Sequence, residues 1–95
     1  MYHYLTIDAE LHGTGIRTTY DGESVEPHEI GIDKVLEKRI KEWVKSYSQV
    51  LIYERTESFE TLDNEGIKIA QLIKQQFPEN KIKYFSAGTC KEILI

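Results

Sequence analysis

The chain has 95 residues, of which 40% are hydrophobic and 11% aromatic, and its formal net charge at pH 7 is −4. This length predicts a single domain over residues 1–95, and the aromatic content excludes a disordered chain. Negative charge opposes approach to a phosphate backbone, so we expect no nucleic-acid partner.

The single cysteine, Cys90, excludes an intramolecular disulfide and favours a reducing compartment. No apolar run approaches the roughly 18 residues that cross a bilayer, and the amino-terminal residues lack the pattern of a secretory signal. We therefore expect a cytoplasmic protein without a membrane partner. The glycine-containing stretch 12–15 lacks the Lys-Ser/Thr pair of a phosphate loop, and we expect no cofactor.

The first part of the chain predicts extended structure. Residues 2–7 are rich in aromatic and β-branched types, which indicates a strand, and residues 16–20 extend again before an Asp-Gly turn signal. Gly13 and Gly15 interrupt the pattern and are typical of a bend or bulge. This region therefore predicts a hairpin or an edge strand.

The strongest periodic signal predicts a first helix over residues 32–47. Apolar residues recur there at steps of three and four, and Asp33 is placed to cap the first turn. Basic residues cluster on the same segment, and we interpret them as a solvated helix face. They are Lys34, Lys38, Arg39, Lys41 and Lys45.

The second half of the chain predicts strand, helix and strand. The nearly continuous apolar run 49–53 indicates a buried central strand. Apolar residues share one helical face over residues 62–77, and Pro78 limits continuation. Residues 81–85 alternate as a further strand and are followed by a loop and the apolar tail 93–95.

Strands that alternate with helices predict an α/β fold. We expect a sheet of three to five strands with a mainly parallel core, an N-terminal hairpin or edge strand, and two main helices. An α+β sheet with antiparallel pairing is the alternative.

Asp8, Glu10 and His12 form a candidate metal site. If the first strand continued through them, their spacing of two residues would place all three side chains on one face. Carboxylate and imidazole ligands suit divalent transition metals.

In a parallel sheet, the carboxyl ends of three strands would bring Asp8 and Glu10, Glu54 and Arg55, and the loop 86–90 to one edge. Open α/β sheets bind ligands there. This predicts an enzyme or small-ligand binder in which Asp8, Glu10 and Glu54 hold a metal or act as general acids and bases.

The residues carry no recognisable catalytic motif, which favours a binding protein and leaves catalysis open. The acidic charge predicts a small inhibitor or immunity-type protein that neutralises a basic protein partner. The predicted partner-binding residues are Asp21, Glu23, Glu26, Glu54, Glu57 and Glu60. Self-association as a homo-oligomer, through the apolar tail or an edge strand, is a further alternative.

Overall fold

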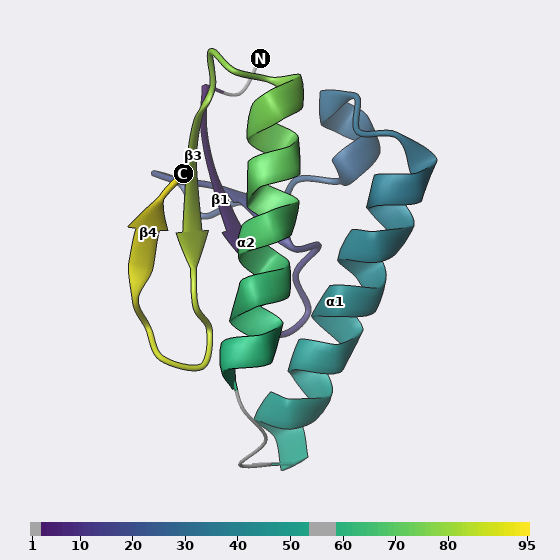
Figure 1. The fold of residues 1–95 in the computed structure, drawn as a ribbon, viewed down its shortest axis with the longest axis vertical. Coiled ribbons are helices and arrows are strands. Elements are labelled where there is room, and N and C mark those ends of the chain that lie inside the picture. Colours follow the sequence, from purple (N-terminus) through teal and green to yellow (C-terminus); the bar gives the residue numbers. More distant parts are fainter. Residues whose placement is uncertain (1–2, 54–58) are drawn as a thin grey trace.

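A parallel pair of strands forms the centre of the sheet. The computed structural model describes residues 3–53 and 59–95. Its elements are the strands β1 (Tyr4–Asp8) and β2 (Ile16–Thr18), the 3₁₀ helix η1 (Pro27–Ile30), the helices α1 (Lys34–Tyr53) and α2 (Phe59–Gln76), and the strands β3 (Lys81–Phe85) and β4 (Glu92–Leu94). The strand order is β2-β1-β3-β4, and both long helices lie against one face of the sheet (Figure 1).

Only β1 and β3 are parallel. Leu5 pairs with Ile82 and Ile7 with Tyr84, whereas β2 pairs antiparallel with β1 and β4 antiparallel with β3. The predicted mixed α/β class with two main helices is confirmed, and four strands fall within the predicted range. The expectation of a mainly parallel core is wrong, because most of the pairing is antiparallel as in the alternative.

The predicted central strand over residues 49–53 is also wrong. These residues form the end of α1, which runs without interruption to Tyr53. The buried positions Trp43, Tyr47 and Val50 follow one another at steps of four and three, so the apolar stripe of the helix continues into the run. A short apolar run fits a helix as well as a strand by periodicity alone, and here packing on the core decides for the helix.

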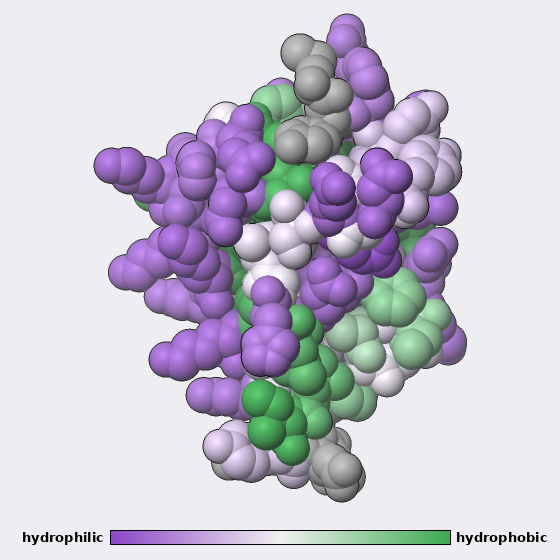
Figure 2. Space-filling view, turned by 180° about the vertical axis from the view of Figure 1, so that it is seen from behind, coloured by the Kyte–Doolittle hydropathy of each residue, from purple (hydrophilic) through white to green (hydrophobic). Residues whose placement is uncertain are grey.

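Local signals at the start of α1 act as predicted. The Asp33 carboxylate accepts the Leu36 N–H at 2.8 Å, which satisfies a backbone donor of the first turn. Of the basic residues of the predicted solvated face, Lys34, Lys38, Lys41 and Lys45 are exposed, whereas Arg39 is partly buried and pairs with Glu65 of α2 at 2.7 Å. Figure 2 shows hydrophilic side chains projecting along the side of the molecule that α1 occupies.

The helices cover one continuous core. A glycine allows the closest approach, since a Cβ on Gly66 would lie 2.3 Å from the Tyr84 ring and 2.6 Å from the Trp43 ring. Neither α1 nor α2, over the residues described, is long and apolar enough to cross a membrane. The largest wholly buried side chains of the core include Leu5, Ile7, Ile16, Ile40, Tyr47, Ile69, Ile73, Ile82 and Tyr84.

Candidate functional site

A polar cluster of Tyr47, Asp63, Tyr84 and Ser86 lies at the carboxyl end of β3, where β3 meets both helices; we call it the Asp63 cluster. The Asp63 carboxylate accepts hydrogen bonds from the Tyr84 hydroxyl at 2.6 Å, the Tyr47 hydroxyl at 2.9 Å and the Ser86 hydroxyl at 2.8 Å. Both carboxylate oxygens are therefore engaged by O–H donors. These bonds tie α1, α2 and β3 together.

The same cluster holds the turn between β3 and β4. The Gly88 N–H donates to the Tyr47 hydroxyl at 2.9 Å, and the Thr89 N–H donates to Ser86 Oγ at 3.1 Å. A Cβ on Gly88 would lie 2.4 Å from the Phe59 ring, so a glycine is needed for the turn to rest there. The turn is thus fixed against both helices.

Burial sets the protonation of the two phenols. It is the main cause that raises the pKa of Tyr84 far above its ordinary value, and the hydrogen bond to Asp63 raises it further. Burial likewise raises the pKa of Tyr47, which outweighs the lowering effect of Ser86 and Gly88. Both phenols stay neutral donors near pH 7, so neither is a general base at that pH.

A cavity of about 270 Å³ adjoins the cluster. Asp63, Tyr84 and Ser86 contribute to its lining, together with Lys91, which precedes β4, and Ile93 of β4 itself. Of the groups predicted to meet at the strand ends, the structure places Ser86 and Thr89 of the loop 86–90 here. Glu54 and Arg55 lie outside the described residues, and the residues before them are helical instead of a strand.

Asp8 lies on the sheet face that points away from the helices. Its carboxylate accepts the Arg17 Nε–H at 2.9 Å, and the Asp8 side chain is only 5% exposed. The Arg17 guanidinium also lies over the Phe85 ring, 5.6 Å from its centroid. The second carboxylate oxygen, Oδ1, is buried without a hydrogen-bond partner among the described atoms.

The strand geometry assumed for the candidate metal site is not found. β1 ends at Asp8, and His12 is an exposed residue of the following turn with a left-handed φ of 65°. The Glu10 side chain lies beside Gly13, where an added Cβ would be 2.6 Å from Glu10 Cγ. Over residues 3–53 and 59–95, no group of three or more His, Cys, Asp or Glu is placed to hold a metal ion.

The predicted partner-binding carboxylates lie in two places. Asp21, Glu23 and Glu26 are exposed in the segment after β2, which we call the acidic segment (residues 20–29). Glu60 is exposed in the first turn of α2, at the opposite end of the molecule (Figure 1). Glu54 and Glu57 lie outside the described residues. The structure therefore does not gather the four described members of the set, Asp21, Glu23, Glu26 and Glu60, into one patch.

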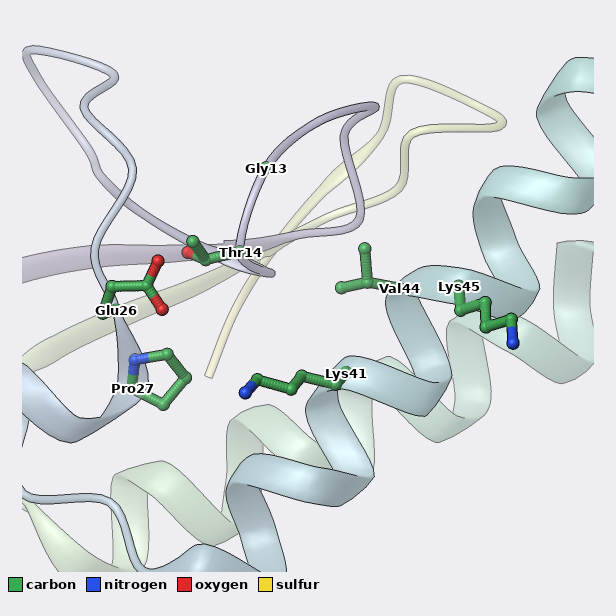
Figure 3. Close-up of a pocket in the computed structure, with 7 residues that line it drawn as sticks. All are labelled: Gly13, Thr14, Glu26, Pro27, Lys41, Val44 and Lys45. Carbon is green, nitrogen blue, oxygen red and sulfur yellow. The ribbon is translucent and has the colours of Figure 1, made fainter.

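A second cavity, of about 330 Å³, lies between the acidic segment and α1. Glu26 and Pro27 line one side and Val44 the other, and Lys41 reaches across from α1 while Lys45 points away (Figure 3). The cavity mixes charges of both signs over apolar atoms. Gly15 closes the neighbouring loop onto α1: its φ is 92°, and a Cβ there would lie 2.7 Å from Ile40.

No family model, curated protein or solved structure matches this chain. Function is therefore argued from the residues themselves. Sequence reasoning missed the Asp63 cluster, although one signal was available. Asp63 precedes Gly66 by three residues and Ala70 by seven, so an acidic residue occupies the apolar stripe of α2 and requires buried hydrogen-bond donors.

Proposed function

We propose that this protein is a binding protein, of the small inhibitor or immunity type, that engages a basic protein partner through the acidic segment. One observation carries the proposal. Asp21, Glu23 and Glu26 are exposed and form no ion pair with any residue that the structure describes. The sequence has no Lys or Arg between Arg17 and Lys34, so these carboxylates lack a neighbouring counter-charge along the chain.

The acidic segment is held in shape by its backbone. The Thr18 N–H donates to the Glu23 carbonyl at 2.9 Å, and the Val25 N–H donates to the Ile16 carbonyl at 2.9 Å. The Glu23 N–H also donates to the Thr18 hydroxyl at 3.0 Å. Val25 is buried in the core. Because the segment is ordered before binding, a partner would lose little free energy in fixing it.

Aromatic side chains lie beside these carboxylates. Tyr20 is 78% exposed and Tyr4 is 46% exposed. Their rings meet edge to face with centroids 5.2 Å apart. Tyrosine supplies apolar contact area at low entropic cost and is enriched at protein interfaces. The pair offers a contact surface next to the charges that would steer a cationic partner.

The test uses charge reversal with a matched control. The variant Asp21→Lys/Glu23→Lys alters exposed side chains for which the structure shows no hydrogen bond or ion pair, so it should fold. The control Glu42→Lys/Glu79→Lys makes the same charge change at exposed sites on α1 and just after α2, outside the predicted partner-binding set. Each protein would be immobilised and exposed to lysate of the source cells, and captured proteins would be identified by mass spectrometry and titrated in purified form.

We expect the wild type and the control to retain the same basic protein, with a complex that weakens as salt rises. The acidic-segment variant should lower its association rate by roughly tenfold or more. A partner that binds the acidic-segment variant and the wild type equally, or one that is neutral or acidic, would overturn the proposal. An equal loss in the control would overturn the assignment to this segment.

The proposed location is the cytoplasm. The support is the single cysteine, Cys90, whose side chain is exposed in the turn before β4. An unpaired exposed thiol suits a reducing compartment. Fractionation of the source cells tests this location, and we expect to recover the protein in the cytoplasmic fraction.

A further inference from the structure

The two edges of the sheet differ. At the β2 edge, residues 23–25 fold back along the strand, with an isolated bridge between Arg17 and Ser24 and hydrogen bonds on either side of it. At the other edge, β4 lies at the outside of the sheet (Figure 1), and no described segment pairs with its outer side. An unpaired edge exposes backbone donors and acceptors that can pair with another strand.

The pairing with β3 shows which backbone groups of β4 are open. The Ser86 N–H donates to the Lys91 carbonyl at 2.9 Å, and the Ile95 N–H donates to the Ile82 carbonyl at 3.0 Å. Backbone groups of an antiparallel strand point to alternate sides. Lys91, Ile93 and Ile95 therefore face β3, and the N–H and C=O groups of Glu92 and Leu94 face outward.

We infer that β4 pairs antiparallel with β4 of a second copy of this chain about a two-fold axis at Ile93, so that two four-stranded sheets become one continuous sheet. The outward-facing residues are two apart, with Ile93 between them. A two-fold axis at Ile93 places Glu92 opposite Leu94 of the second copy in both directions, and all the outward N–H and C=O groups of these residues are satisfied. A register with the two-fold axis at Glu92 would place the Glu92 carboxylates of the two copies opposite each other, which is unfavourable.

The side chains fit this occupant. Ile93 and Leu94 are 45% and 72% exposed, and the pairing would shield both from water. Glu92 keeps a partner in its own sheet, since Lys83 Nζ lies 3.6 Å from its carboxylate. The acidic segment lies beyond the opposite edge, so both copies keep it open.

The strand is short, so the dimer is weak. Interfaces below about 1,000 Å² are typical of transient complexes, and association should appear only at high protein concentration, on the order of 0.1–1 mM. Each copy carries a net charge of −4, so salt should strengthen the dimer by screening repulsion. The proposed complex with a basic partner should respond to salt in the opposite direction.

Sedimentation and amide hydrogen exchange across a concentration series test the inference. We expect the mass to rise from 11.1 kDa toward twice that value. As the mass rises, the amides of Glu92 and Leu94 should become protected from hydrogen exchange. The amide of Ile93 faces β3 and should be protected at every concentration. Leu94→Pro removes an outward N–H that bonds nothing within the copy, and it should abolish the dimer while the melting temperature stays close to that of the wild type.

A matched control replaces another exposed apolar residue. Val35, near the start of α1, is 82% exposed. Val35→Lys should leave the dimer intact, whereas Leu94→Lys should abolish it. In a Cys90→Ser background, Ile93→Cys should form a disulfide between copies, since paired Cα atoms at the axis lie within disulfide range. A mass that stays at one copy up to about 1 mM, or a dimer that persists in Leu94→Pro, would overturn the inference.

Discussion

Asp63 is the acceptor on which the contact between both helices and β3 depends, so we expect Asp63→Ala to be strongly destabilising. Its carboxylate accepts hydroxyl hydrogen bonds from Tyr47, Tyr84 and Ser86. A hydrogen bond to a charged group contributes about 1.5–3 kcal/mol, but bonds that share one acceptor are not additive. Alanine would also leave the Tyr84 hydroxyl without its partner, whereas the Tyr47 and Ser86 hydroxyls, 3.2 Å apart, could still bond each other. We expect a loss of about 3 kcal/mol, a large part of the roughly 5–15 kcal/mol typical of a domain.

Urea unfolding followed by the fluorescence of Trp43 measures this loss, because Trp43 is the only tryptophan and is 3% exposed. Asp63→Asn keeps the shape and one carbonyl acceptor, and it should cost about half as much. Asn64→Ala, one residue along on the exposed side of α2, should change the free energy of unfolding by less than about 0.5 kcal/mol. A loss of less than about 1 kcal/mol in the free energy of unfolding for Asp63→Ala would refute the inference that this cluster stabilises the contact between both helices and β3.

Two further predictions concern Gly66 and Tyr84. Gly66→Ala gains up to about 1 kcal/mol of helix propensity but forces a Cβ to within 2.3 Å of the Tyr84 ring, so urea unfolding should show a net loss of about 1–2 kcal/mol; a more stable variant would contradict this. Because burial raises the pKa of Tyr84 in the folded state, the stabilisation is present below the unfolded pKa of about 10 and is lost as pH rises above it. Between pH 10 and 11.5 the stability of Tyr84→Phe should fall less steeply than that of the wild type. The difference in slope should rise from about 0.7 toward about 1.4 kcal/mol per pH unit, and equal slopes would count against the burial argument.

The two proposed interactions use opposite edges of one sheet. The acidic segment covers the β2 edge and presents carboxylates, whereas the β4 edge presents open backbone groups and the apolar side chains of Ile93 and Leu94. Salt should weaken binding at the first edge and strengthen pairing at the second. Salt titrations of the two complexes therefore separate the proposals.

Local features of this fold could be read from the sequence. The apolar stripe of α1, the Asp33 cap, the strand Lys81–Phe85 and the bend at Gly15 each depend on residues close together in the chain. Periodicity and cap chemistry report such features because a helix turn or a pleat repeats within a few residues. These signals were sufficient to predict a mixed α/β domain with two main helices.

Contacts between distant residues decided the rest. Residues 49–53 are helical because Val50 continues the apolar stripe that packs on the core. They are therefore not a strand of the sheet, and the parallel pair is β1 and β3. Asp63 meets Tyr47, Tyr84 and Ser86 at separations of 16 to 23 residues along the chain. A five-residue apolar run is compatible with both a helix and a strand, so its sequence alone does not decide between them. Hydrogen bonds between residues this far apart in the chain form only once the elements are packed together. Only the tertiary structure therefore determined the strand pairing and the buried polar cluster.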